Sequence, residues 1–146
     1  MYKHLLVPTD GSPLSLKAAR SAAKLAGGLG ARITALYVIP PFSLPGTGDA
    51  VMFHVAHDER EYQRGMRKHA DGALAKVAAA AGRVRCDTVS TLHEHPWAAI
   101  IEAASSRKCD LLVMASHGRR GLAGLLLGSE TRKVLTHSKT PVLVCR

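Results

Sequence analysis

The residues with the clearest chemical potential in this chain lie in one glycine-rich segment, residues 114–131 (MASHGRRGLAGLLLGSET). Gly118 and Gly121 tolerate positive φ and let main-chain N–H groups approach a ligand closely. Gly128 and Ser129 then open a helical pattern, and the unpaired N–H groups and dipole of a helix N-terminus favour an anion. Serine is equally suited to cap a helix. These residue types therefore fit either a phosphate-holding loop or a capped turn between a strand and a helix.

The same segment carries His117, Arg119 and Arg120, which are residue types used in phosphoryl transfer. Histidine acts as a general acid or base, and arginine stabilises transferred charge. However, the chain contains no GxxxxGK[ST] loop, and no GxGxxG follows its first predicted strand. No acid/base and metal set accompanies the three residues, so we expect electrostatic attraction of a ligand and assign no catalytic residue.

Histidine pairs are the remaining candidates for metal ligands. His93-x-His95 and His54-x2-His57 each place two imidazoles within reach of one another. Neither pair has a cysteine or carboxylate cluster at zinc spacing, so we expect no metal site made by the protein alone. The three cysteines are scattered and form no CxxC pair. This usage fits free thiols in a reducing cytoplasm.

Charge and hydropathy exclude several classes of protein. The 146 residues carry a formal charge of +9, but their bases are spread along the chain with no block of five or more. We therefore do not expect sequence-directed nucleic-acid binding. No run of eighteen apolar residues occurs, so we expect no membrane span. The N-terminal MYKHLLVPTDGS has too short an apolar run for a signal peptide and instead predicts a first strand.

Short aliphatic runs alternate with helical patterns along the whole chain. A Ser12 cap and Pro13 at the first turn predict a helix that ends at the glycines of 27–30. Proline and glycine make 40–58 a long surface loop. The predicted strands are 4–8, 33–39, 83–92, 110–114 and 141–145, and the other predicted helices are 59–81, one opened by 96–97, and 129–137. Such an alternation predicts one α/β domain over 1–146, with a parallel sheet covered by helices on both faces.

Ligands of open parallel sheets bind beyond the carboxyl ends of the strands, where the winding direction reverses. The first and fourth predicted strands flank that point. Their ends carry Pro8–Gly11 and Met114–Gly118, which are rich in glycine and polar side chains. The sequence therefore predicts a binding crevice between these two loops.

Two stretches resemble the universal stress protein family, and the resemblance covers the whole chain. They are HLLVPTDGSPLSLKAA near the N-terminus and DLLVMASHGRRGLAGLLLGSETRKVLTHSKTPVLV near the C-terminus. The second is similar to the G-x2-G-x9-G-[ST] signature of the ATP-binding branch, here Ala115-x2-Gly118-x9-Gly128-Ser129. Ala115 departs from the signature by one methyl group, from which we expect reduced or unchanged affinity. The family's fold is an open five-stranded parallel sheet of order 3-2-1-4-5, Rossmann-like and similar to that of the adenine-nucleotide alpha hydrolases.

The resemblance also implies a bound adenine nucleotide, ATP or else AMP or ADP, with or without Mg²⁺ or Mn²⁺. Asp10 and Val38 would line the adenine end and Ala115 would lie by the ribose, although Val38 fits simple core packing equally well. Glu130 suits a phosphate site only if a cation intervenes or its side chain points away. The residues implied to surround the nucleotide are Pro8, Thr9, Asp10, Val38, Met114, Ala115, His117, Gly118, Arg119, Gly128, Ser129, Glu130 and Thr131.

The assembly and role implied by the resemblance are those of a cytoplasmic stress-response protein. The predicted last strand, Pro141–Cys145, would be a sheet edge, and the family pairs such edges across a two-fold axis in a homodimer. Nucleotide occupancy would then regulate conformation or the choice of a protein partner. A nucleotide-free interaction module of the same fold is the alternative, and a slow ATPase is a lesser one.

Overall fold

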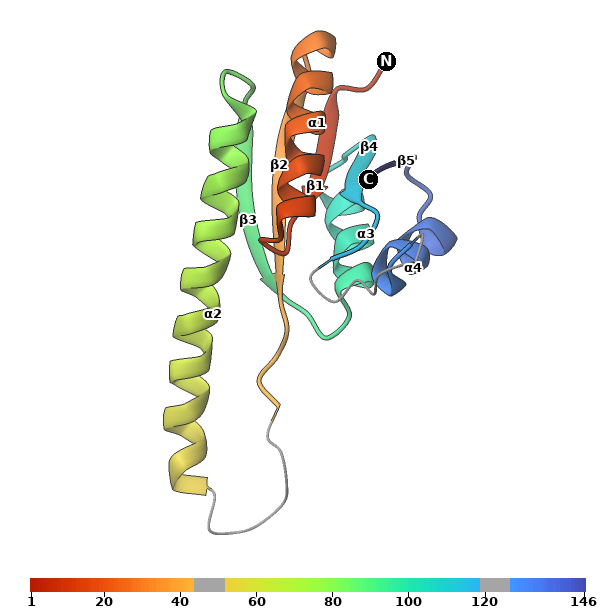
Figure 1. Cartoon of the computed structure of the whole chain (residues 1–146). Helices are drawn as coiled ribbons and strands as arrows, with labels where there is room; N and C mark the ends of the chain where they lie inside the picture. Colours follow the sequence, from red (N-terminus) through yellow and green to blue (C-terminus); the bar gives the residue numbers. More distant parts are fainter. Residues whose placement is uncertain (44–51, 119–126) are drawn as a thin grey trace.

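The computed structural model describes residues 1–43, 52–118 and 127–146, with side chains from residue 57 onward in the second range. Strands and helices alternate along the chain, as the hydropathy pattern predicts (Figure 1). The elements are β1 (His4–Pro8), α1 (Pro13–Leu29), β2 (Arg32–Ile39), α2 (Met52–Ala81), β3 (Cys86–Leu92), α3 (Pro96–Ser106), β4 (Leu111–Ala115), α4 (Ser129–His137) and β5 (Val142–Cys145).

The five strands form one parallel sheet in the order β3-β2-β1-β4-β5, which confirms the predicted fold class. β2 and β3 pair over seven residues, whereas β1 and β4 pair only at Leu5 with Leu111 and Leu6 with Leu112. The winding direction reverses between β1 and β4. The switch point therefore lies where the sequence predicts it.

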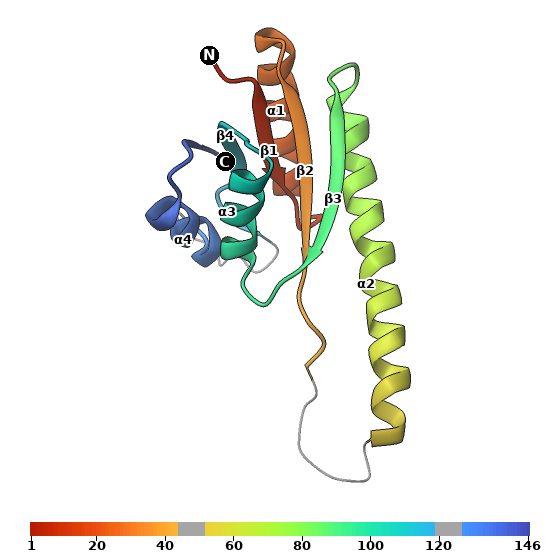
Figure 2. The same ribbon diagram turned by 180° about the vertical axis from the view of Figure 1, so that it is seen from behind.

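Each face of the sheet is covered by two helices (Figures 1 and 2). Residues of β1 alternate between the faces: Leu5 and Val7 join the cluster under α1 and α2, and Leu6 joins the cluster under α3 and α4. This period of two is the pleat of a strand. Because β1 is covered on both sides, all three side chains are fully buried and the strand appears in the sequence as an unbroken aliphatic run.

Helix α1 packs closely against the sheet through a stripe of buried alanines. Its ends are those that the sequence predicts. The Ser12 side chain accepts a hydrogen bond from the N–H of Ser15, Pro13 occupies the first turn, and Gly30 ends the helix in the left-handed conformation at φ 64°. Helix and loop are thereby fixed relative to the end of β1.

Two predicted boundaries are wrong. Helix α2 begins at Met52 rather than at residue 59, so the predicted loop 40–58 is shorter, and residues 44–51 lie outside the described part. No proline or glycine occurs between Gly48 and Gly65, so nothing in that stretch breaks a helix. Strand β3 begins at Cys86 rather than at residue 83, because the left-handed Gly82 turns the chain first. In the described part of the chain, no helix is both long and apolar enough to cross a membrane.

Candidate functional site

The loops that follow β1 and β4 lie at the same edge of the sheet, because these two parallel strands are neighbours (Figure 1). Thr9 and Asp10 follow β1, and Ser116 to Gly118 follow β4. The structure therefore brings together the two predicted groups of site residues. Arg119, Arg120 and Gly121 lie outside the described residues, so their predicted roles stay predictions.

The loop after β1 is held rigidly by its own side chains. The Thr9 hydroxyl accepts the N–H of Gly11 at 3.1 Å and lies 3.0 Å from the hydroxyl of Ser15. One carboxylate oxygen of Asp10 accepts the N–H of Ser12 at 2.9 Å, and Gly11 takes a positive φ of 81°. This is the turn geometry that a short acidic side chain stabilises. Asp10 is therefore a turn-forming residue whose second oxygen, Oδ2, faces the other loop.

Gly118 is the point where the two loops touch. A Cβ atom at this position would stand only 2.5 Å from Oδ2 of Asp10. No other residue type fits unless the carboxylate moves, and the bond from Ser12 restrains that movement. The close approach of a side chain thus favours glycine here, a reason that the spacing motif by itself does not supply.

The start of α4 folds back onto the end of β4. The N–H of Gly128 donates to the carbonyl of Ser116 at 2.7 Å, and a Cβ at residue 128 would lie 3.1 Å from the Cα and Cβ of His117. The hydroxyl of the buried Thr131 donates to the carbonyl of Ala115 at 3.0 Å. These contacts fix the first turn of α4 directly beyond the end of β4.

The N-cap of α4 is Gly128, not Ser129, and this corrects the capping interpretation. Gly128 has an extended backbone (φ −70°, ψ 161°), and its carbonyl accepts the N–H of Arg132 at 3.0 Å. Ser129 is the first helical residue, and its side chain is exposed. A glycine cap supplies no side-chain acceptor. The first N–H groups of α4 are therefore not satisfied by their own cap, which suits an anion.

Glu130 directs its carboxylate away from the start of its own helix and toward α3. Its Oε2 accepts the N–H of Trp97 at 2.9 Å, and its Oε1 lies 3.6 Å from the Lys133 ammonium. His95, the N-cap of α3, makes no side-chain capping bond. The Glu130 carboxylate therefore takes over that role across 33 residues of sequence. The Glu130 carboxylate therefore interacts with α3 and Lys133, whereas its main-chain N–H lies in the first turn of α4.

Replacing the Glu130 carboxylate should loosen α3. We expect Glu130→Ala to lower the free energy of unfolding by about 1 kcal/mol, the usual cost of a lost N-cap. Urea unfolding measures this cost. Lys133→Ala is the matched control, because it removes only the exposed ion-pair partner, and such pairs contribute about 0–1 kcal/mol. Equal costs in the two variants would contradict the capping role.

The remaining predicted residues divide between core and loop. Met114 is buried and Val38 is half-buried, and both belong to the hydrophobic cluster under α3 and α4. Pro8 is half-buried at the end of β1. His117 is half-buried at the loop, with its Nδ1 3.2 Å from the Ser116 hydroxyl. Val38 and Met114 thus serve the core, and only their placement at strand ends puts them near the crevice.

The described side chains do not assemble a metal centre. Among them, no three His, Cys, Asp or Glu residues gather in a geometry that could hold a metal ion. The Nδ1 of His93 accepts the N–H of His95 at 2.8 Å, and its Nε2 lies 3.6 Å from Glu102. The His93 ring is therefore already occupied by local partners.

A shallow hollow of about 120 Å³ lies elsewhere, between α2 and the ends of β2 and β3. Sequence reasoning does not predict it. Its lining combines Ile39 and the exposed Leu92 with the polar side chains of Gln63, Ser90 and Thr91, and Arg67 is the one charged side chain among the described residues that line it. It has neither the closely packed glycines nor the helix N-terminus found at the loops after β1 and β4, so those loops remain the candidate site.

The strand order, the switch point and the two apposed loops define a doubly wound α/β protein whose winding reverses between β1 and β4, the place where open parallel sheets bind their ligands. The chain belongs to the universal stress protein family, whose model matches residues 1–146.

Individual relatives support this assignment over the whole chain. It is 35% identical to universal stress protein MJ0531 of Methanocaldococcus jannaschii, over 100% of this chain and 83% of that protein. The solved structure of hypothetical protein MJ0577 superimposes with a TM-score of 0.81 at 25% identity, covering 99% of this chain and 95% of that one. A universal stress protein crystallised in complex with cAMP gives a TM-score of 0.67 at 28% identity, covering 99% and 97%.

Proposed function

We propose that this protein binds an adenine nucleotide, ATP or a product of it, at the carboxyl ends of β1 and β4, and acts as a nucleotide-dependent regulator of the cytoplasmic stress response. The adenine and ribose would lie by Asp10 and Ala115. The phosphates would lie against the first turn of α4, at Gly128, Ser129 and Thr131. Contacts there are mostly from main-chain N–H groups, which recognise phosphate by geometry and dipole.

The contact between the loops is the observation that carries this proposal. Gly118 lies against the Asp10 carboxylate with no room for a methyl group, and Gly128 lies against His117. The two glycines are separated by the nine residues that the family signature requires. Local turn chemistry needs neither close approach. Both are explained if the two loops and the start of α4 form one nucleotide-binding wall, with Asp10 at the adenine and ribose end and the N–H groups of α4 at the phosphates.

The relative crystallised with cAMP supports the adenine part of the proposal. A divalent cation, if one accompanies the nucleotide, would be held chiefly by the phosphates. Among the described residues the nearest acidic side chain on α4 is Glu130, and it is committed to Trp97 and Lys133. Asp10 is the remaining carboxylate at the crevice.

We propose that the protein forms a homodimer through β5. This strand is one edge of the sheet, and Leu143 on it is 42% exposed. An edge that carries an exposed leucine favours pairing with another strand. Pairing with the same edge of a second copy would satisfy both edges across a two-fold axis.

Two other readings of the site are open to test. A nucleotide-free interaction module would keep the fold and the dimer but no ligand, with Ala115 as the sign of a degenerate site. A slow ATPase would use His117 as acid or base, although its Nδ1 lies beside the Ser116 hydroxyl and the described residues supply no metal centre. The apposed glycines favour binding over the first reading. The lack of an acid/base and metal set among the described residues favours binding over the second.

Mass spectrometry of the supernatant from freshly purified, denatured protein tests the proposal directly. We expect an adenine nucleotide to be released, and calorimetric titration of the emptied protein to show ATP binding. Ala115→Gly should bind equally well or several-fold more tightly, because it removes the extra methyl. No released nucleotide together with no heat at millimolar ATP would refute the proposal. Steady ATP turnover that disappears in His117→Ala would favour the enzyme.

A further inference from the structure

The starts of four neighbouring strands carry a row of basic side chains, at the opposite end of the sheet from the candidate site. Lys3 precedes β1, Arg32 begins β2, Arg85 precedes β3 and Lys108 lies shortly before β4. Because the strands are parallel, their starts share one edge. We call this the amino edge, and its bases, all exposed, are Lys3, Arg32, Arg83, Arg85, Arg107 and Lys108.

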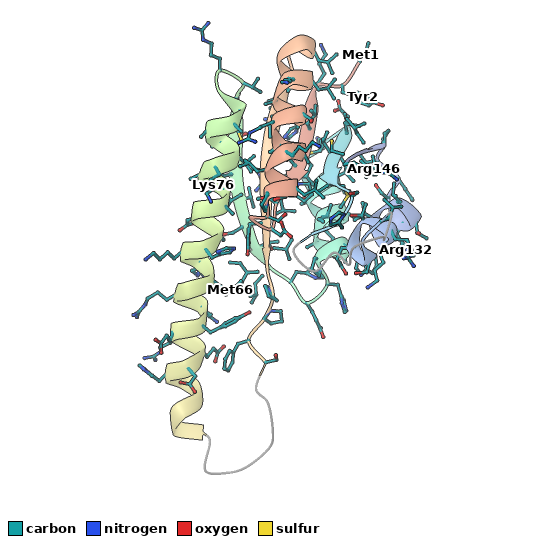
Figure 3. The ribbon with its side chains drawn as sticks, in the orientation of Figure 1. Met1, Tyr2, Met66, Lys76, Arg132 and Arg146 are labelled. Carbon is teal, nitrogen blue, oxygen red and sulfur yellow. The ribbon has the colours of Figure 1, made fainter. Side chains whose placement is uncertain are left out.

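Backbone hydrogen bonds show that Lys3, Arg32 and Arg85 lie at adjacent strand starts. The N–H of Arg32 donates to the carbonyl of Lys3 at 3.0 Å, and the N–H of Ile33 donates to the carbonyl of Arg85 at 2.8 Å. Adjacent strands are about 4.8 Å apart, so the four strand starts span about 15 Å. The N-terminus, with Met1 and Tyr2, lies at the same end of the molecule (Figure 3).

The buried thiol of Cys109 lies close enough to two of these bases, Arg32 and Arg107, to feel their charges. Burial raises the pKa of this thiol to about 11, and the charges of both Arg32 and Arg107 oppose that rise. Arg32 begins β2 and Arg107 follows α3, so they come from separate parts of the chain. Both nevertheless act on one side chain at the start of β4.

Acidic side chains offset only part of this charge. Asp87 lies 3.8 Å from Arg85, in an ion pair whose side chains are 42% and 71% exposed. Asp110 accepts the N–H groups of Lys3 and His4, at 2.8 and 3.0 Å. Six bases against two acids leave four positive charges on one edge of the sheet.

Lys108 holds its place on this edge in a conformation that lysine disfavours. Its φ is 54°, and it is the only non-glycine residue with positive φ in the described part of the chain. The left-handed region costs a non-glycine residue about 1–2 kcal/mol, and glycine is the usual residue at such helix ends. The charge of a lysine suits the C-terminus of α3, but the backbone conformation does not, so the chain keeps a positive charge at this edge at a conformational cost.

We infer that the amino edge binds the phosphate backbone of a nucleic acid without regard to its sequence. A linear row of cations matches a linear row of phosphates, and such contacts position a backbone without reading bases. Tyr2, the aromatic residue nearest the edge in sequence, packs against the core cluster under α1 and α2. It therefore provides no free platform for base stacking. The nucleotide crevice, at the far ends of the strands, does not take part.

Lys108→Gly tests this inference without threatening the fold. We expect the glycine to relieve backbone strain and raise the melting temperature. At the same time, affinity for a 20-base-pair DNA duplex, measured by fluorescence anisotropy in 0.1 M KCl, should fall about five- to tenfold. The slope of log K against log salt should shrink by about one, the contribution of one phosphate contact. Arg32→Gln should lower the affinity and the slope similarly.

Arg60→Gln is the matched control, because it removes one exposed arginine from α2, 21 residues before the helix reaches the amino edge. It should leave the affinity unchanged. The inference is overturned if the duplex does not bind the wild type in low salt, or if Arg60→Gln weakens binding as much as Lys108→Gly does. It is also overturned if inorganic polyphosphate binds and the duplex does not. Binding that persists in a variant with a blocked nucleotide crevice separates this inference from the proposed function.

Discussion

Gly128→Asp is expected to weaken ATP binding by at least about 100-fold, or about 2.7 kcal/mol, while the protein stays folded. Asp is among the best N-cap residues, and its carboxylate would accept the N–H groups of the first turn of α4. Those are the same N–H groups that the phosphates are proposed to occupy. The new negative charge also repels phosphate at that point, and the Cβ would press on His117 at 3.1 Å.

Calorimetric titration with ATP measures the loss, and thermal unfolding shows that the fold is retained. Gly72→Asp is the matched control. It makes the same chemical change at an exposed position of α2 where a Cβ would meet no atom within 4 Å. We expect it to bind ATP as the wild type does. Normal binding by Gly128→Asp would place the phosphate site elsewhere, and an equal loss in Gly72→Asp would point to net charge as the cause.

The sheet could be predicted from the sequence because buried parallel strands leave a direct hydropathy signal. β1 and β4 are aliphatic runs whose ends carry polar loops, and a single winding reversal then fixes the position of the crevice. The start of α2 could not be predicted this way. Its first turns follow a segment rich in proline and glycine, and composition alone does not show where helix replaces loop.

The glycines that shape the backbone of the site could be predicted from the sequence, but the roles of several side chains could not. The Gly118–Gly128 spacing is local, so it is visible in the sequence. The use of Glu130 to cap α3 joins residues 33 apart and leaves no local pattern. Val38 and Met114 are apolar strand residues, and such residues look the same in a sequence whether they line a ligand or fill a core.

The basic residues of the amino edge show most clearly that a sequence pattern misses a feature formed by residues far apart in the chain. The bases of the amino edge stand at positions 3, 32, 83, 85, 107 and 108, so no block of charge appears along the chain. Parallel topology brings them to one edge, because every strand starts there. A sequence pattern that argues against sequence-directed recognition of nucleic acid is therefore compatible with contact to its backbone.

Asp110→Asn is expected to lower the free energy of unfolding by about 2 kcal/mol at neutral pH, in the range of hydrogen bonds to a charged group. The carboxylate accepts N–H groups from both Lys3 and His4 and so ties the start of β1 to β4. Those strands pair directly at only two positions. An Asn amide can accept one of the two bonds, but it turns a donor toward the other N–H.

The loss should depend on pH in a defined direction. Burial raises the pKa of Asp110, but the N–H groups of His4 and Lys3 outweigh it and hold that pKa below its usual 3.8. The unfolded chain therefore takes up the proton first as the pH falls. The carboxylate's stabilisation is complete above about pH 3.8 and is lost as the pH falls through the lower folded value. Urea unfolding should thus show the wild type and Asp110→Asn converging in acid.

Asp87→Asn is the control for this effect, since its partner Arg85 is exposed and such ion pairs contribute about 0–1 kcal/mol. A cost at Asp87 equal to that at Asp110 would contradict the strand-tying role. Asp110→Asn also removes a negative charge from the amino edge, so it should bind duplex DNA more tightly although it is less stable. Lys108→Gly should be more stable than the wild type and should bind duplex DNA more weakly. If the less stable variant also bound duplex DNA more weakly and the more stable variant bound it more tightly, binding would depend on stability and not on the charge of this edge.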